Sequence, residues 1–571
     1  MKRLLKTATL LVGTGLATVL AAQTPTPTQT PTPTPPPGPR QTEAAAAASP
    51  RLLVIIVLDQ FRADFVEQYS QRWTKGLRRL LDGGAVFQNA AYPYAGTYTC
   101  AGHATIGTGT FPATHGMSGN TFYDRTLRRT VPCAFDGDVA SLPFGGGIGK
   151  ERHSARSLLV PTFTDELRRQ ARQLPQIVSL GQKPRTAITM AGKGGPGTMA
   201  VWEEDDGTWA TSDAFTKTAW PEVDDFVRAH PMNKDYGQVW TLLMPPSAYR
   251  YTDDGAGEAR PAPWTRTFPH PVISTTGKPD MEFVTAWERS PLDDAFLTDL
   301  AIHLLQTLKL GTGTRTDMLT LSLPSLDHNG HEFGPRSFEV QDVLFRLDIQ
   351  IGRLLDAITA QVGTNFVVAL SSDHGSAAVP EQITAEGGDA GRVSTTELRN
   401  GINAAVRNVL GLPTNSTVNF VASIYEENIA LTPGVVDQVR MQPGGLDAVK
   451  SAIAGVKGVA AVFSGDDILG GAASTDPVMR AWRLSYVPGR SGDFVLTPRA
   501  NWIVRSVSGT THGTLNPYDQ RVPLILYGSK IRSGEYPGAA SPADIVTTFG
   551  ALTGVQLARA QGRVLTEALV R

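Results

Sequence analysis

The chain has 571 residues, of which 41% are hydrophobic and 18% are charged, so it can bury a large core and is not globally disordered. Its 52 basic and 53 acidic residues leave a formal net charge of -1, which provides no broad electrostatic footprint for nucleic acid or an anionic membrane. Two cysteines exclude a disulfide scaffold, a cysteine-rich zinc ribbon and an iron–sulfur protein.

The first 50 residues are predicted to be a signal peptide and a linker. Residues 1–22 begin with basic side chains, continue with an apolar stretch at 7–20 and end in small residues. That stretch is shorter than the roughly 20 residues of a membrane span, which favours a cleaved signal over an anchor. A Thr-Pro repeat and an alanine run make 23–50 an extended spacer. We therefore expect a periplasmic or secreted protein without a transmembrane segment after cleavage.

The folded part, 51–571, contains three short apolar runs that end in a carboxylate. They are Arg51–Asp59, Met318–Asp327 and Asn365–Asp373. Apolar, β-branched runs without strict alternation are typical of central strands that are covered on both faces. The segments Asp294–Leu310 and Glu339–Gln361 have helical periodicity. Strands that alternate with helices predict an α/β fold, a doubly wound, mostly parallel sheet flanked by helices, which binds ligands at the carboxyl ends of its strands.

Two stretches of the folded part fit this alternation poorly. Residues 194–290 are rich in Trp, Pro, Gly and Asp, and we expect an inserted cap there. Residues 388–500 contain a helical pattern at Thr396–Leu410 and strands of their own, which predicts a second inserted subdomain. The folded part is thus expected to be one catalytic domain with two insertions.

Candidate metal ligands occur at the predicted strand ends. They are Asp59, Asp327, His331, Asp373, His374 and His512, the last just before a predicted strand at Arg521–Tyr527. Three aspartates and three histidines are enough for two divalent cations, and imidazole with carboxylate suits catalytic Zn²⁺ with an open coordination position. Each residue taken alone is as readily explained as a helix cap or a loop histidine. Their common position at strand ends favours the metal site.

The segment Gly96–Gly109 combines hydroxyl and small residues in a loop that leads into a predicted helix. A bound anion would meet free N–H groups at the start of that helix. No base is evident next to the hydroxyl, and metal coordination can activate it as a nucleophile instead. Thr97, Thr99 and Thr105 are candidates, and the residues alone leave open that they only cap the helix.

Taken together, these segments resemble the alkaline phosphatase superfamily, and within it the PafA-type bacterial alkaline phosphatases that use a threonine nucleophile. The resemblance covers nearly the whole chain after the linker, in the same order. It implies that Thr99 is the nucleophile. It further implies that one zinc is held by Asp59, Thr99, Asp373 and His374, and the other by Asp327, His331 and His512.

The resemblance also assigns three residues to the phosphoryl group. Asn120 matches an asparagine that binds a phosphoryl oxygen, and Lys183 and Arg185 match a Lys-x-Arg pair of monoesterases, here with Pro184 where Asp is usual. We expect this pair to precede a strand at Thr186–Met190. Two fixed cations suit a dianionic monoester and take the space that the second ester group of a diester needs. Without the resemblance, the pair would be interpreted as a surface turn.

The expected function is an exported, zinc-dependent phosphomonoesterase that acts through a phosphothreonine. Lys183 is expected to replace a third, Mg²⁺-type site, so we predict two Zn²⁺ and no Mg²⁺ requirement. Small phosphate monoesters are the expected substrates of a monomer without a nucleic-acid partner. The alternatives are a phosphodiesterase or nucleotide pyrophosphatase, a sulfatase, and a non-catalytic exported metal-binding module. Cys100 and Cys133 are interpreted either as a disulfide or as two buried thiols.

Overall fold

The computed structural model describes residues 49–570. The predicted signal peptide, 1–22, and all of the predicted linker, 23–50, except its last two residues lie outside the described part. Within 49–570, no helix has the length and apolar character needed to cross a membrane.

A ten-stranded sheet forms the centre of the described part, with the strand order β20-β2-β19-β12-β1-β11-β6-β7-β8-β5. Its strands are β1 (Leu52–Leu58), β2 (Ala85–Ala90), β5 (Ser141–Pro143), β6 (Ile177–Gly181), β7 (Thr198–Glu203), β8 (Trp209–Ser212), β11 (Asp317–Leu323), β12 (Phe366–Ser371), β19 (Leu524–Gly528) and β20 (Gly534–Ala540). The five strands from β12 to β7 are parallel to one another, and they pair antiparallel with β19 and β8. The predicted doubly wound, mostly parallel sheet is confirmed.

Strand β1 shows why the central strands are continuously apolar. All seven of its residues are buried. Leu53 and Ile55 belong to the hydrophobic cluster on one face of the sheet, whereas Val54 and Ile56 belong to the cluster on the other face. Because successive side chains of a strand point to opposite faces, a strand covered on both sides is apolar at every position.

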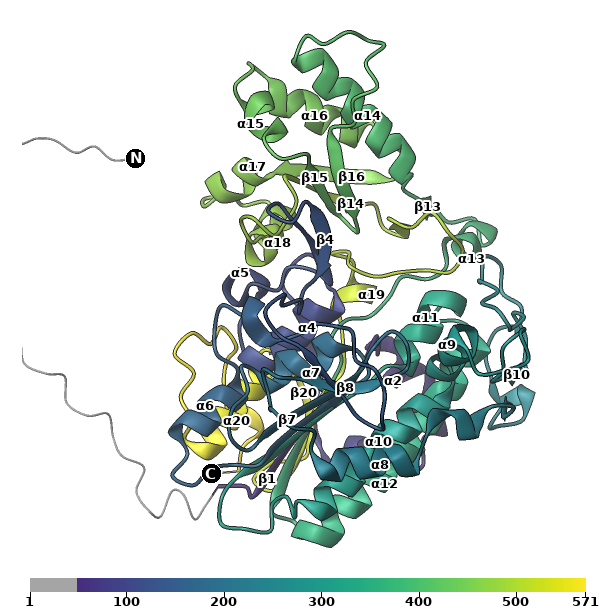
Figure 1. Ribbon diagram of the computed structural model, residues 1–571, viewed down its shortest axis with the longest axis vertical. Helices are drawn as coiled ribbons and strands as arrows, with labels where there is room; N and C mark the ends of the chain where they lie inside the picture. Colours follow the sequence, from purple (N-terminus) through teal and green to yellow (C-terminus); the bar gives the residue numbers. More distant parts are fainter. Residues whose placement is uncertain (1–48, 571) are drawn as a thin grey trace, which may run out of the picture. The chain divides into compact units, whose positions relative to one another are not determined.

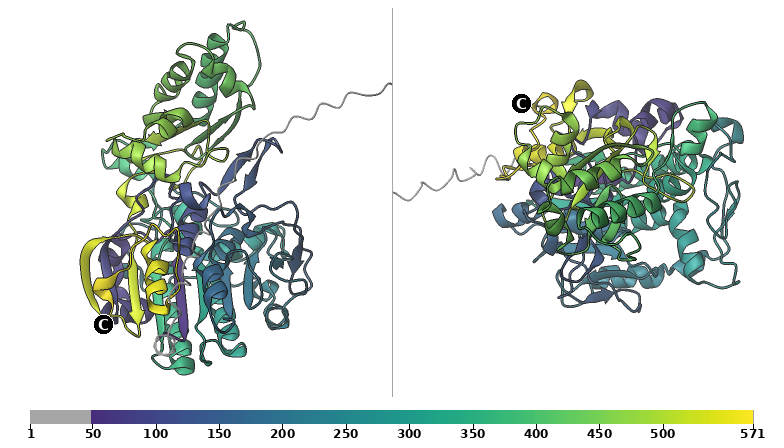
Figure 2. Two further views of the ribbon diagram at one scale, coloured as in Figure 1. Left: turned by 90° about the vertical axis from the view of Figure 1, so that its left-hand side faces the viewer. Right: turned by 90° about the horizontal axis from the view of Figure 1, so that it is seen from above.

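Helices cover both faces of this sheet (Figure 1 and Figure 2). The cluster that contains Val54 also takes side chains from α3 (Gly76–Gly83), α10 (Pro291–Thr307) and α12 (Phe338–Val362). The cluster that contains Leu53 takes side chains from α4 (Thr99–Thr108), α6 (Phe163–Gln170) and α20 (Asp544–Thr553). The helices predicted at Asp294–Leu310 and Glu339–Gln361 are therefore present as α10 and α12, with ends shifted by a few residues.

The strand predicted at Thr186–Met190 is wrong, because these residues form part of helix α7 (Pro184–Ala191). Pro184 occupies its first turn, where a proline needs no N–H partner and its fixed φ suits a helix. The five residues from Thr186 to Met190 are all buried. A short, fully buried apolar segment has no polar face, so its periodicity does not distinguish a helix from a strand.

The start of the first predicted insertion is also wrong. Strands β7 and β8 lie within 194–290, yet both belong to the ten-stranded sheet. Asp205, Asp206 and Gly207 belong to the short connection 204–208 between these two strands. The rest of the stretch contains α8 (Pro221–Ala229), β9 (Val239–Trp240), β10 (His270–Pro271) and α9 (Met281–Arg289).

Residues 388–500 form a separate four-stranded sheet of order β14-β15-β17-β16 (Figure 1). Its elements are α14 (Thr395–Val409), β14 (Val421–Tyr425), β15 (Asn428–Leu431), α15 (Val435–Arg440), α16 (Gly445–Ala454), β16 (Val459–Ser464), α17 (Gly465–Gly470), α18 (Pro477–Ser485) and β17 (Phe494–Pro498). Helices α14, α15 and α16 share one hydrophobic cluster with this sheet, which includes Ile402, Val449 and Phe494, whereas α17 and α18 contribute to a second, smaller cluster. The helix predicted at Thr396–Leu410 is α14. We call this segment the inserted subdomain.

The remaining elements connect these parts. They are α2 (Asp64–Tyr69), α5 (Pro112–His115), β3 (Thr121–Asp124), β4 (Arg129–Pro132), α11 (Ser325–Phe333), α13 (Pro380–Ala385), β13 (Gly391–Arg392), β18 (Trp502–Ile503) and α19 (Pro517–Gln520). Strands β3 and β4 form an antiparallel hairpin. Strand β13 pairs with β18 and so joins the two ends of the inserted subdomain.

Candidate active site

Two of the predicted ligands follow neighbouring parallel strands. β1 and β12 are in register at Val57 and Ser371, and Asp59 and Asp373 each lie two positions further along. Both carboxylates are fully buried. His374 follows directly, and its Nε2 lies 3.4 Å from Asp59 Oδ1 and 3.3 Å from Asp373 Oδ2. The structure thus brings these three residues together at the carboxyl edge of the sheet.

Asp327 lies at the same edge of the sheet, but on a helix and not at the end of a strand as predicted. Strand β11 ends at Leu323, and Asp327 lies in the first turn of α11. His331 is one helical turn later, with Nε2 at 3.2 Å from Asp327 Oδ1. Residues four apart on a helix lie on the same face, which explains this contact. His512 Nε2 is 3.8 Å from Asp327 Oδ1.

The side chains form two groups that could each hold a metal ion. One consists of Asp59, Asp373 and His374, and the other of Asp327, His374 and His512, with ligand atoms within 4.8 Å of one another in each. The second group contains His374 where His331 was expected. His374 lies between the groups because its ring stacks on His512 at 3.5 Å between centroids.

The buried carboxylates fit divalent cations. Asp59 Oδ1 and Asp373 Oδ2 are buried and have no hydrogen-bond partner among the described residues, which is costly for a charged group. Burial, together with the nearby Asp327 and Asp373 carboxylates, raises the pKa of Asp59 well above its usual value. Lys183 brings one positive charge to three aspartates, so cations bound among them would balance the remaining charge.

The three candidate histidine ligands direct an unprotonated Nε2 atom, which can bind a metal ion, toward the carboxylates. The Nδ1 atoms of His331, His374 and His512 lie 2.8–3.0 Å from the backbone oxygens of Thr510, Gly375 and Thr97, respectively. A carbonyl oxygen only accepts, so each Nδ1 carries the proton and each Nε2 is left as a free electron pair facing the carboxylates. Burial and the two neighbouring histidines lower the pKa of His512 well below its usual value, which favours this neutral form.

Thr99 is the first residue of α4 and is almost completely buried. Its Oγ1 lies 3.3 Å from His374 Nε2, next to the first ligand group. His103, one turn later, contacts the backbone oxygen of Thr99 at 2.9 Å and Asp373 Oδ2 at 3.2 Å, both through Nδ1. The Thr99 backbone and the Asp373 carboxylate therefore contact the same imidazole.

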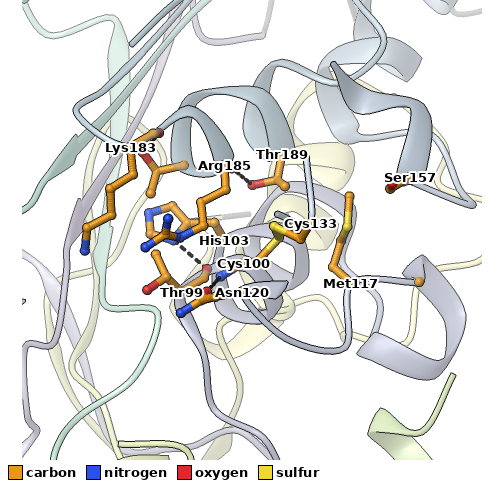
Figure 3. Close-up of a disulfide and its surroundings, with 12 residues drawn as sticks. Thr99, Cys100, His103, Met117, Asn120, Cys133, Ser157, Lys183, Arg185 and Thr189 are labelled. Atoms are coloured by element: carbon orange, nitrogen blue, oxygen red, sulfur yellow. Dashed lines mark hydrogen bonds between the residues drawn. A yellow bond between two sulfur atoms is a disulfide. The ribbon is translucent and has the colours of Figure 1, made fainter. Parts of the chain in front are cut away.

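Asn120 is fixed against α4. Its Oδ1 accepts a hydrogen bond from the Cys100 N–H at 2.9 Å, and its backbone oxygen accepts one from the Cys133 N–H at 2.9 Å. Cys100 and Cys133 form a disulfide, which decides between the two alternatives left open by the sequence (Figure 3). With Oδ1 occupied, the Asn120 side chain offers its NH₂ group as a donor.

Lys183 and Arg185 lie at the start of α7, and in Figure 3 both side chains extend toward the side of the site where Thr99 lies. Lys183 Nζ donates to Asp59 Oδ2 at 2.7 Å and to Asp327 Oδ2 at 2.5 Å. Burial lowers the pKa of Lys183, but the two carboxylates outweigh it and the net shift is upward. Arg185 Nε is buried and has no hydrogen-bond partner within the described part of the chain. Lys183 is thus held by the ligand aspartates, whereas Arg185 keeps donor capacity for a bound anion.

Gln60 belongs to the site but was not predicted from the sequence. Gln60 Nε2 donates to Asp327 Oδ1 at 2.7 Å, and its backbone N–H donates to Asp373 Oδ1 at 3.2 Å. Gln60 adopts a φ of 68°, which is uncommon outside glycine. Its position directly after Asp59 is the only signal in the sequence that could have pointed to it.

A family model described as Type I phosphodiesterase / nucleotide pyrophosphatase matches residues 53–520. The chain is 28% identical over 525 residues to a protein of Myroides odoratus named calcium-transporting ATPase, which covers 89% of this chain and 92% of that protein. It is 28% identical over 538 residues to alkaline phosphatase PafA of Elizabethkingia meningoseptica, covering 91% and 95%. A solved structure of a PafA variant superposes with a TM-score of 0.82 at 27% identity, covering 91% of this chain and 99% of that one. The chain therefore belongs to the type I phosphodiesterase / nucleotide pyrophosphatase family, and within the alkaline phosphatase superfamily it is a PafA-type hydrolase.

Proposed function

We propose that the chain hydrolyses phosphate monoesters through a phosphothreonine at Thr99. The observation that carries this proposal is the position of the Thr99 hydroxyl at the start of α4, 3.3 Å from His374 and beside the buried Asp59 and Asp373 carboxylates. No carboxylate or imidazole acts on this hydroxyl as a free base, because the same groups are the candidate metal ligands. A hydroxyl in such surroundings suits nucleophilic attack that is assisted by metal ions.

The metal ions are proposed to be two Zn²⁺. Neutral imidazoles and carboxylates without thiolates suit catalytic zinc. Asp59, Thr99, Asp373 and His374 would hold one ion, and Asp327, His331 and His512 the other. When bound, the ions lower the pKa of a coordinated hydroxyl and neutralise negative charge on the reacting oxygens.

In the proposed reaction the residues of the chain have the following roles. Thr99 Oγ forms a bond to phosphorus while the bond to the ester oxygen breaks, and that oxygen leaves with the electron pair and takes a proton. Water then attacks the phosphothreonine, phosphate leaves, and Thr99 regains its proton. The Asn120 NH₂ group and the Arg185 guanidinium would hold the non-bridging oxygens, where charge resides in the transition state. Lys183 would support this charge while it orders Asp59 and Asp327.

The comparisons support these four roles. The PafA variant named above carries substitutions of a threonine, an asparagine, a lysine and an arginine. These are the four residue types, in the same chain order, that we assign here as Thr99, Asn120, Lys183 and Arg185. We also propose that residues 1–22 direct the chain out of the cytoplasm, as the sequence pattern predicts.

A phosphodiesterase or nucleotide pyrophosphatase is the second candidate, because the matching family model has that description. The substrates of the two candidate activities differ in negative charge and in the space they need. A monoester dianion benefits from both Lys183 and Arg185, whereas a diester carries one charge and needs room for a second group.

The proposal is tested with the full-length protein, an aryl phosphate monoester and the matching diester, together with metal content by mass spectrometry. We expect a higher kcat/KM for the monoester and about two zinc ions per chain. Thr99→Ala should lose nearly all turnover yet keep its zinc. Full activity of Thr99→Ala would contradict the covalent scheme, and a preference for the diester would favour the second candidate.

A further inference from the structure

The nucleophile segment and the His512 segment are bound to each other at several points. The Gly96 N–H donates to Gly513 O at 3.1 Å, and His512 Nδ1 donates to Thr97 O at 2.8 Å. Thr97 Oγ1 donates to Thr514 O at 3.4 Å. A displacement of one segment must therefore displace the other, which couples Thr99 to a candidate metal ligand.

Tyr98 lies where these two segments meet. It immediately precedes Thr99, is fully buried, and its ring centroid is 6.1 Å from that of His512. A Cβ added to Gly513 would lie 2.4 Å from Tyr98 Cε1, and Gly513 has a φ of 116°. Gly513 is thus the residue that lets the His512 segment approach the Tyr98 ring.

The inserted subdomain fixes the far end of Tyr98. The two-residue turn between β14 and β15 consists of Glu426 and Glu427. The Tyr98 hydroxyl donates to Glu427 Oε2, and the Glu427 N–H contacts the same hydroxyl oxygen at 3.5 Å. Glu427 is 2% exposed, and its Oε2 would also lie 2.9 Å from a Cβ at Gly513. The turn therefore closes against both segments of the site.

We propose that Glu427 is a positioning residue of the active site: by holding the Tyr98 hydroxyl it presses the Tyr98 ring against Gly513 and fixes Thr99 relative to His512. The inserted subdomain thereby completes the site, although none of its residues is a candidate metal ligand or nucleophile. This inference rests on the role of Thr99 proposed above.

Substitutions in the full-length protein distinguish two roles of Glu427: positioning of Tyr98 and Thr99, or only attachment of the inserted subdomain to the catalytic part. Glu427→Ala removes the acceptor, and Glu427→Gln keeps an amide oxygen that accepts the Tyr98 O–H. Arg125→Ala is the matched control, because Arg125 Nη2 binds Asp493 Oδ1 at 2.7 Å and so ties the β3–β4 hairpin to the same subdomain without contacting Tyr98.

The readouts are kcat and KM for the aryl monoester, zinc content, melting temperature, and hydrogen exchange of the amides in 96–99 and 512–514. We expect Glu427→Ala to lower kcat by about 10- to 100-fold with KM changed by less than about 3-fold, since a small misplacement of reacting groups acts on the chemical step. Exchange should rise in both segments. Glu427→Gln should recover most of kcat, and Arg125→Ala should keep kcat even if it lowers the melting temperature.

Equal kcat values for Glu427→Ala and Arg125→Ala, or unchanged exchange in both segments, would overturn the positioning role. A Glu427→Gln variant as impaired as Glu427→Ala would overturn the role of the hydrogen bond. If Glu427→Ala does not fold, Tyr98→Phe replaces it, since it loses the same bond from the other side. A fully active Thr99→Ala would refute the proposed function instead, and the exchange data would still decide whether Glu427 holds the two segments.

Discussion

Lys183 Nζ donates to Asp327 Oδ2 at 2.5 Å, across the gap between the start of α7 and the first turn of α11. The same ammonium reaches Asp59 at 2.7 Å, so one cation spans both candidate ligand groups. This contact places a fixed positive charge inside the site.

Replacement of Lys183 should therefore impair the chemical step. Lys183→Ala leaves Asp59 and Asp327 without their shared cation and should lower kcat/KM for an aryl monoester by about 100-fold, as loss of one transition-state donor does elsewhere. Steady-state kinetics with parallel zinc analysis measure this effect. Activity within about 2-fold of the unmodified protein would mean that Lys183 only fills space.

Arg185 should determine the preference for monoesters over diesters. Its buried Nε has no hydrogen-bond partner among residues 49–570, so this donor is available to a second phosphoryl charge. Arg185→Ala should lower kcat/KM for the monoester at least about 10-fold more than for the matching diester, because the diester lacks that charge. Arg185→Lys keeps the charge but loses the planar fork, and it should give an intermediate ratio. An unchanged ratio in Arg185→Ala would remove Arg185 from the phosphate pocket.

The Cys100–Cys133 disulfide should contribute to stability and to the position of Asn120. It joins the second residue of α4 to the segment that holds the Asn120 backbone. The double variant Cys100→Ala, Cys133→Ala should lose about 2–4 kcal/mol of unfolding free energy. Denaturant titration of this variant, and of the unmodified protein with and without a thiol reductant, measures the loss. Reduction without any change in the midpoint would contradict the prediction.

Glu427 should make stability pH-dependent. Burial, with a smaller effect from Asp519, raises the pKa of Glu427 to about 8 in the folded protein. Between the usual carboxyl pKa and about 8, the folded state holds a proton that the unfolded state has released, so this residue lowers stability as the pH rises through that window. Glu427→Gln cannot ionise, and its melting temperature relative to the unmodified protein should therefore be higher at pH 9 than at pH 5. An equal difference at both pH values would contradict the raised pKa.

Metal removal should abolish activity and destabilise the protein. Asp59, Asp327 and Asp373 are buried close together, and without cations their mutual repulsion is opposed mainly by Lys183. A chelator should eliminate turnover and lower the melting temperature. Added Zn²⁺ should restore both, whereas Mg²⁺ alone should restore neither, because Lys183 already occupies the place between the ligand groups. Restoration by Mg²⁺ would contradict the metal assignment.

The sequence by itself determined the central sheet and most of the candidate ligands. Both faces of strands such as β1 are covered, so these strands are apolar at every position. The first carboxylates, Asp59 and Asp373, occur just beyond the carboxyl ends of β1 and β12. That break from apolar run to carboxylate is local and can be recognised without a structure. The roles of Thr99, Lys183 and Arg185 came from the family resemblance, since a threonine or a Lys-x-Arg pair has no distinctive local pattern.

The tertiary structure decided what local pattern could not. Residues 186–191 of helix α7 and all of strand β7 are buried, so neither short segment has an exposed polar face to reveal its period. Asp327 enters the site from a helix and not from a strand end. The bond between Tyr98 and Glu427 joins residues 329 positions apart. Contacts of this kind depend on how the inserted subdomain packs against the catalytic part. Packing between distant segments produces no hydrophobic periodicity in either segment, so the sequence pattern does not reveal it.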